Sequence, residues 1–229
     1  TLENEVLKLG LDVEDIIFNR GQQRHAEGYS AGSFWQKEVT WNDADGNGKL
    51  TNDEVTLADE ATFQGVALPK WQRTVFADAR IFDWLTVSTL FEGRGGNITA
   101  NDTEGFRCGR RSTYGCDAVG NPDASLYEQA RYIADRYLGS SEGYMEKADF
   151  WKWRELSLSF DMPTFLVDNL SQLDGLRVTL AGRNLAVWTD YTGIDPETVE
   201  GGGNANFSQS EFNTQPPVRY FMLRLDYSF

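Results

Sequence analysis

The stretch that decides the fold is Arg219-Tyr-Phe-Met-Leu-Arg-Leu-Asp-Tyr-Ser-Phe229. Its apolar side chains fall at every second position, which are Phe221, Leu223, Leu225, Tyr227 and Phe229. Between them stand Met222, Arg224, Asp226 and Ser228, which are mostly polar. Successive side chains of a strand point to opposite faces, so this stretch predicts an amphipathic strand. A strand of about ten residues with an apolar outer face and a polar inner face is what a transmembrane β-barrel needs.

The same alternation occurs in soluble β-sandwiches, which leaves a second interpretation open. The last residues of a soluble domain usually fray into water, whereas this stretch ends on the aromatic Phe229. The sequence has no apolar run of about eighteen residues, the length that a membrane-spanning helix requires. Barrel strands are apolar on one face only and need no such run. We therefore expect an all-β, antiparallel transmembrane β-barrel.

The first residues and the net charge indicate which part of a barrel this sequence forms and which partners it lacks. The sequence of 229 residues begins Thr1-Leu2-Glu3, without an initiator Met, a basic stretch or an apolar signal segment. A barrel needs an export signal and a closed wall, so residues 1–229 are expected to be the C-terminal strands of a larger barrel. The net charge of −14 argues against nucleic acid as a partner. In a barrel, this charge would lie in the lumen and the outer loops.

Segments with the same period recur along the chain, as expected for neighbouring strands. Trp71–Phe82 and Trp84–Arg94 alternate on either side of Asp83, which offers a tight turn. Leu176–Val187 loses its alternation near Asn184, which indicates a bulge or the end of the apolar band. The remaining segments are Ser33–Trp41, which is aromatic and β-rich, and Trp151–Asp161.

The connections between these segments alternate in length. Phe82-Asp83 is a tight turn and Met162–Gly175 is moderate in length, with a short helix expected after Pro163. Residues 42–70, 95–149 and 188–217 are long and rich in Gly, Asn, Asp and Pro. Such long loops are unusual in a compact soluble domain. Outer-membrane barrels have short turns on one side and long loops on the other. With a periplasmic C-terminus, every long connection is extracellular, so 42–70 and 95–149 are predicted to be extracellular loops.

One of these loops is predicted to contain a short helix over Ser125–Leu138. Apolar residues recur there at helical spacing, at Leu126, Ala130, Ile133 and Tyr137. The hydroxyl of Ser125 can accept a hydrogen bond from the first turn, so Ser125 is the expected cap.

Residues Asp43–Glu54 match the calcium loop of EF-hand proteins at each diagnostic position. Gly48 permits the sharp turn, and Leu50 anchors the centre of the loop. The preceding Phe34–Val39 has the pattern of a strand and not of an entering helix, so we expect a calcium-stiffened surface loop and not a paired EF-hand. An Asp- and Gly-rich turn without a metal has a similar sequence. The predicted ligands of a structural Ca²⁺ are Asp43, Asp45, Asn47, Lys49 through its carbonyl, Thr51 directly or through water, and Glu54.

The two cysteines, Cys108 and Cys116, flank a polar stretch that contains Gly and Arg. There is no CxxC motif, so a local disulfide in an oxidising compartment is a better interpretation than a metal site. The only histidine, His25, lies in a polar stretch and is expected on the surface of a loop. One histidine assembles no convincing catalytic triad, and acidic pairs without a spatial constraint do not identify a glycosidase. We therefore expect no enzymatic activity.

Aromatic residues gather near the ends of the predicted strands, where the interfacial girdles of membrane barrels lie. A second interpretation is that some of them face the lumen or the loops and stack on sugar rings. These residues are Trp71, Trp151, Trp153, Trp188, Tyr191 and Tyr220.

Several stretches, taken in order, resemble a single family. They are Gly28–Phe34, the Asp43–Glu54 loop, Glu155–Pro163, Leu176–Leu185, Trp188–Glu197, Gln215–Arg219 and the terminal strand. Together they are similar to the C-terminal part of SusC/RagA-type TonB-dependent transporters, over nearly the whole chain. Arg183 and the cysteine-containing stretch match no fixed pattern of that family.

The resemblance implies a large barrel in the outer membrane of a Gram-negative bacterium, with an N-terminal plug energised by the TonB complex and absent from this chain. It also implies import of glycan oligomers or peptides, a SusD-like surface lipoprotein as partner, and contact with outer-membrane lipid. The barrel assembly machinery would capture the last strand through Phe221, Leu223, Leu225, Tyr227 and Phe229. The alternative is a secreted calcium-stabilised β-domain that binds carbohydrate and packs its apolar strand faces into a core.

Overall fold

The computed structural model describes residues 3–10, 13–110, 116, 118, 121, 123–163, 175–200 and 207–228. The chain forms two compact units. The first comprises Thr1–Trp71, Gly95–Asp149 and Asp190–Pro216, and the second comprises Gln72–Arg94, Phe150–Thr189 and Pro217–Phe229. Each unit therefore combines segments that are distant in sequence.

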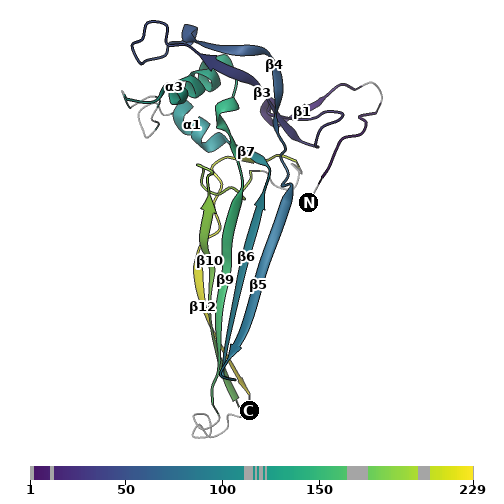
Figure 1. Ribbon diagram of the computed structural model, residues 1–229, viewed down its shortest axis with the longest axis vertical. Coiled ribbons are helices and arrows are strands. Elements are labelled where there is room, and N and C mark those ends of the chain that lie inside the picture. Colours follow the sequence, from purple (N-terminus) through teal and green to yellow (C-terminus); the bar gives the residue numbers. More distant parts are fainter. Residues whose placement is uncertain are drawn as a thin grey trace. The chain divides into compact units, whose positions relative to one another are not determined.

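The second unit is built on one five-stranded antiparallel sheet with the order β12-β10-β9-β6-β5 (Figure 1). Along the sheet, each strand pairs with the segment of this unit that precedes or follows it in the chain, as the sequence predicts. The bounds lie within two residues of the predicted ones, and Phe229 lies outside the described residues. The strands are β5 (Trp71–Ile81), β6 (Leu85–Gly95), β9 (Phe150–Asp161), β10 (Gly175–Thr189) and β12 (Tyr220–Ser228).

The predicted tight turn between β5 and β6 is confirmed at Phe82-Asp83. Both residues have positive φ, 55° and 51°, which non-Gly residues adopt mostly in tight turns, and only Phe82, Asp83 and Trp84 separate the two strands. The guanidinium of Arg80 donates to the carbonyl oxygen of Asp83 at 2.6 Å. The turn therefore fixes β5 against β6. The connection Met162–Gly175, with the short helix expected after Pro163, falls mostly outside the described residues.

The register of the sheet aligns the apolar side chains of four strands. Val178 of β10 stands opposite Leu225 and Phe160, and Phe160 stands opposite Leu85. A second row, two residues along each strand, consists of Val87, Leu158, Leu180 and Leu223. Both rows lie on one face because side chains two residues apart share a face.

This apolar face is exposed most strongly on β12 and β10. Leu180 retains 45% of its accessible surface and Leu223 retains 62%, whereas Val87 and Leu158 of the same row are half-buried. The opposite face carries the polar row Thr86, Ser159, Thr179 and Arg224, in which the hydroxyls of Ser159 and Thr179 are 3.0 Å apart. The sheet is therefore amphipathic across β6, β9, β10 and β12.

The loss of period near Asn184 is a β-bulge, one of the two predicted explanations. The register between β10 and β9 shifts between Arg183 and Ala186. Asn184 has a positive φ of 52°, and its side-chain amide donates to the carbonyl oxygen of Val218 at 2.9 Å. Beyond the bulge, β10 and β9 pair again, and Trp188 stands opposite Trp151.

The first unit contains two small sheets and short helices. The four-stranded sheet has the order β1-β2-β3-β4, and in the three-stranded sheet β11-β7-β8 the pair β11 and β7 is parallel. The strands are β1 (Ile16–Phe18), β2 (Gln23–His25), β3 (Ser33–Trp41), β4 (Val55–Gly65), β7 (Ile98–Asn101), β8 (Met145–Lys147) and β11 (Ser210–Glu211). The helices are α1 (Asp102–Arg110), α3 (Leu126–Ile133), the π turn η3 (Ala134–Leu138), and the 3₁₀ turns η1 (Asn19–Gly21), η2 (Asn52–Glu54) and η4 (Glu142–Tyr144).

The predicted helix and its cap are confirmed. The side chain of Ser125 accepts a hydrogen bond from the backbone N–H of Glu128 at 3.2 Å, which satisfies one of the free donors of the first turn. The apolar stripe of α3 packs with β4 into a small core of Val55, Ala130, Ile133 and Ala134. No helix of the described residues is long and apolar enough to cross a membrane.

One expectation needs correction. The segments 42–70 and 95–149, expected as loops with one helix, also contain the eleven-residue strand β4 and the elements β7, α1 and β8. The described strands of the second unit form an open sheet with β12 and β5 at its edges, as expected for a part of a larger sheet. The described strands are mostly antiparallel, as predicted, apart from the pair β11 and β7.

Gly93 offers a test of the packing within the five-stranded sheet. It stands opposite Trp151, and a Cβ atom on Gly93 would lie 2.6 Å from Cδ2 of the indole. We expect Gly93→Ala to force this ring out of place and to destabilise the full-length protein by about 1–3 kcal/mol. Denaturant unfolding of the purified protein measures the change.

Gly105→Ala is the matched control, because its Cβ atom would lie 3.5 Å from Tyr144, an ordinary contact. Equal unfolding midpoints for Gly93→Ala and the unmodified protein would show that the indole of Trp151 has room to move.

Candidate functional site

The structure brings the acidic residues of the predicted calcium loop together. Carboxylate oxygens of Asp43, Asp45 and Glu54 all lie within 4.8 Å of one another. The ends of the loop are joined by a 2.9 Å hydrogen bond from the backbone N–H of Asn42 to the carbonyl oxygen of Glu54. Gly46 and Gly48 have φ values of 70° and 76°, where a side chain would be strained. The loop thus forms a concave arrangement of oxygen atoms.

Two of the remaining predicted ligands, Asn47 and Thr51, bond directly to members of this cluster, and Lys49 bonds to Asn47. Asn47 donates through its side-chain amide to Asp45 at 2.6 Å, and its own side-chain oxygen accepts from the backbone N–H of Lys49 at 2.7 Å. The hydroxyl of Thr51 donates to Glu54 at 3.0 Å. Oxygen-rich loops of this kind suit Ca²⁺, which prefers six to eight oxygen ligands. Metal binding itself stays a prediction.

Backbone N–H groups hold two of the carboxylates ionised. A hydrogen bond from the N–H of Gly48 lowers the pKa of Asp43, and the N–H groups of Thr51 and Ala44 lower the pKa of Glu54. A carboxyl with a lowered folded-state pKa stabilises the fold above its unfolded pKa. That contribution is lost as the pH falls through the lowered values, so acid should loosen the loop.

The side chain of Gln129 ties the calcium loop to α3, a link that the sequence analysis missed. The side-chain oxygen of Gln129 accepts from the N–H of Leu50 at 2.8 Å, and its amide donates to the carbonyl oxygens of Gly48 at 3.0 Å and Ala124 at 2.9 Å. The signal in the sequence was a polar residue on the apolar stripe of the helix, three positions after Leu126. A buried amide at such a position requires partners.

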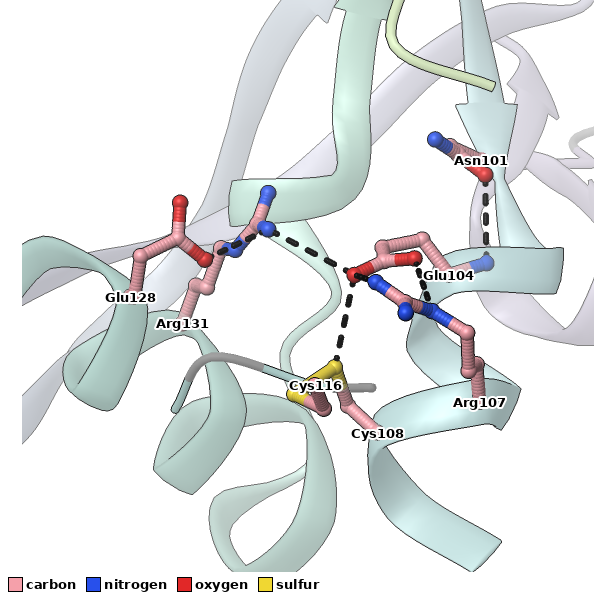
Figure 2. The surroundings of a disulfide bond; sticks show 7 residues. All are labelled: Asn101, Glu104, Arg107, Cys108, Cys116, Glu128 and Arg131. Atoms are coloured by element: carbon pink, nitrogen blue, oxygen red, sulfur yellow. Dashed lines mark hydrogen bonds and ion pairs between the residues drawn. A yellow bond between two sulfur atoms is a disulfide. The ribbon is translucent and has the colours of Figure 1, made fainter. Parts of the chain in front are cut away.

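Cys108 and Cys116 form a disulfide at the end of α1 (Figure 2). These residues and Glu104 also form a cluster that could suit a metal, but disulfide sulfurs lack the charge of a thiolate ligand. Glu104 is instead held by Arg107 at 2.6 Å and lies 3.9 Å from the guanidinium of Arg131. The ion pair between Glu104 and Arg131 links α1 to α3, and the disulfide ties the end of α1 to Cys116.

Two single residues differ from their expected positions. His25, expected on a loop surface, lies half-buried in β2, where its Nδ1 accepts from the N–H of Gly32 at 3.0 Å. Its ring packs edge-on against Phe207. Tyr191, expected in an aromatic girdle, is buried in the first unit with its hydroxyl 3.5 Å from Glu211. Neither residue has a neighbouring pattern in the sequence that predicts its burial.

Other aromatic residues do lie near strand ends. Trp71 and Tyr220 begin β5 and β12, and Trp188 stands one residue before the end of β10. Trp153 stacks on Phe91 with ring centroids 5.5 Å apart, and its indole N–H donates to the hydroxyl of Thr89 at 2.8 Å. These positions suit an interfacial belt.

No protein-family signature matches this sequence, and no curated protein matches it. Solved structures match over 98% of the chain and over about a quarter of their own length. One is the RagAB peptide importer in a closed-closed state, with a TM-score of 0.70, 20% identity and 26% of its chain covered. A structure of the RagAB peptide transporter has a TM-score of 0.69 and 20% identity over 26% of its chain.

The RagAB importer in an open-open state gives a TM-score of 0.64 and 18% identity over 25% of its chain. Identities this low establish the fold alone. The resemblance to the C-terminal part of SusC/RagA-type transporters is therefore confirmed in fold: this chain has the architecture of about a quarter of a RagAB importer chain.

Proposed function

We propose that this chain supplies strands and surface loops of an outer-membrane barrel that imports nutrients. The observation that carries the proposal is the pair of in-register apolar rows on one face of the five-stranded sheet, in which Leu180, Leu223 and Leu225 are exposed. Apolar surface left in water is unfavourable. Contact with the hydrocarbon of a bilayer removes that cost, and the polar opposite face suits a water-filled lumen.

The alternative, a secreted β-domain that binds carbohydrate, is less well supported. A sandwich buries its apolar strand faces against a second sheet. The described strands of the second unit all belong to one sheet, and Leu223 and Leu225 are more than half exposed. The lipid-facing role therefore fits these side chains better.

The fold likeness to the RagAB peptide importer supports import by a transporter and favours peptides as cargo, while glycan oligomers remain the other cargo that the sequence resemblance implies. We further propose the outer membrane of a Gram-negative bacterium as the location, a TonB complex as the energy source and a SusD-like surface lipoprotein as the partner. No catalytic residue is assigned, because the proposed role is transport.

A charge placed on the apolar face tests the contact with lipid. We expect Leu180→Arg to cost about 2–4 kcal/mol near the bilayer centre and to lower the amount of full-length protein in the outer-membrane fraction. Thr179→Arg is the matched control, because the neighbouring side chain points to the polar face. Quantitative immunoblotting of membrane fractions measures both. Equal amounts of the two variants would contradict the lipid-facing assignment.

The edge strand β12 is proposed as the contact for the barrel assembly machinery, through Phe221, Leu223, Leu225, Tyr227 and Phe229. An edge strand exposes backbone donors and acceptors that another sheet edge can pair with. Deleting Phe229 from the full-length protein should lower its outer-membrane level while synthesis stays unchanged, as pulse labelling would measure. If the deletion variant reaches a normal level in the outer membrane, Phe229 is not needed for assembly and has only an interfacial role.

We also propose that Asp43, Asp45, Asn47, Lys49, Thr51 and Glu54 bind a structural Ca²⁺. The three carboxylates repel one another, and a bound cation would remove this repulsion. Calcium binding would then stabilise the folded state by mass action.

Asp43→Ala and Glu54→Ala should each abolish one calorimetric calcium-binding event of the full-length protein. Asp53→Ala, an exposed acidic residue of the same loop outside the ligand set, should leave it unchanged. The site is wrong if all three variants bind calcium as the unmodified protein does.

A further inference from the structure

A cavity of about 380 Å³ in the first unit is lined by none of the predicted calcium ligands. Its volume falls within the range of small-ligand sites, about 300–1,000 Å³. Residues from α1, η3 and η4 line it together with Gln22 from the N-terminal part of the chain. Gly105 of α1 leaves space there, because a Cβ atom on it would lie 3.5 Å from Tyr144 and 3.7 Å from Asp135.

Two buried side chains that line the cavity have an oxygen atom without a hydrogen-bond partner among the described residues. Tyr144 is 1% exposed and Gln22 is 5% exposed, and the unpartnered atoms are the phenol oxygen of Tyr144 and Oε1 of Gln22. Buried polar atoms in native proteins nearly always have a partner. Each of these oxygen atoms can accept a hydrogen bond from a ligand group.

Two carboxylates on the cavity wall add negative charge. Asp102 accepts from the amide of Gln22 and from Arg20, both at 2.8 Å. Asp135 accepts from the hydroxyl of Ser141 at 2.7 Å. Burial raises the pKa of both aspartates, because desolvation disfavours the charged form. A cation in the cavity would stabilise these carboxylates in their charged state.

The cationic side chains of the lining lie at the surface. Arg20 and Arg136 are exposed, and Arg20 is already paired with Asp102 at 2.8 Å and Glu200 at 2.7 Å. Among the described residues, the clusters of three or more acidic, Cys or His ligands that could hold a metal include neither Asp102 nor Asp135. An organic cation fits this lining better than a metal ion.

We propose that this cavity binds a primary ammonium group, as carried by a free amino acid, the N-terminus of a peptide or an alkylamine. An ammonium group has three N–H donors and a positive charge. These match the carboxylate of Asp135 and the unpartnered oxygens of Gln22 and Tyr144. The inference rests on the first unit alone and goes beyond the proposed import function.

The test is calorimetric titration of the full-length protein in detergent and phosphate buffer, since Tris is itself a primary amine. The probes are glycylglycine, N-acetylglycylglycine and n-butylammonium chloride. Glycylglycine should bind, and its acetylated form, which lacks the ammonium charge, should bind at least about tenfold more weakly. If n-butylammonium also binds, the ammonium group alone is sufficient for binding. If it does not bind, the ligands are restricted to amino acids and peptides.

Two variants locate the binding. Asp135→Asn removes a charge at constant size, and Gly105→Leu fills the space beside Tyr144; each should weaken glycylglycine binding by about tenfold or more. Asp59→Asn makes the same charge change at an exposed position of β4 and should bind normally. Thermal unfolding checks that all three fold.

Equal affinity for glycylglycine and its acetylated form, or unchanged binding in both cavity variants, would overturn the assignment. So would the absence of binding by both amines. These results are independent of membrane location and uptake, so the import proposal and the cavity can fail separately.

Discussion

Strand register is the constraint on which the five-stranded sheet depends. A slip of one residue in any pair would move the whole apolar set of a strand to the other face. The turn at Phe82-Asp83 fixes β5 against β6, and the bulge between Arg183 and Ala186 sets how β10 meets β9 near its end. With these two features in place, Leu158, Leu180 and Leu223 form one continuous row.

The first unit is held together by different means. Its apolar clusters are small, and several of its fully buried side chains are polar, including Gln23, Asn101, Ser210 and Glu211. The amide of Gln23 donates to the carbonyl oxygens of Gly32 and Phe207, and its oxygen accepts from the N–H of Gln209. Such networks specify one arrangement because each buried group must find its partner.

This contrast explains which features could be predicted from the sequence. The strands of the second unit, the turn, the bulge and the capped helix follow rules that act within a few residues. The calcium loop is also a local pattern, so the convergence of Asp43, Asp45 and Glu54 followed from their spacing. Strand β4 escaped prediction because Asp59 and Glu60 interrupt its alternation where its register against β3 shifts. The burial of His25 and Tyr191 and the cavity beside Asp135 depend on partners distant in sequence, which periodicity does not reveal.

The parallel pairing of β11 with β7 and the contacts of Gln23 have a consequence for the order of folding. Gln23 bonds to residues 184 and 186 positions away, and Asn19 bonds to Ser210 across 191 positions. Contacts of such long sequence separation form late, because a long loop must close before they form. The N-terminal third of this chain therefore cannot complete its own unit during synthesis. Its buried polar contacts form only after the stretch around Ser210 has been synthesised.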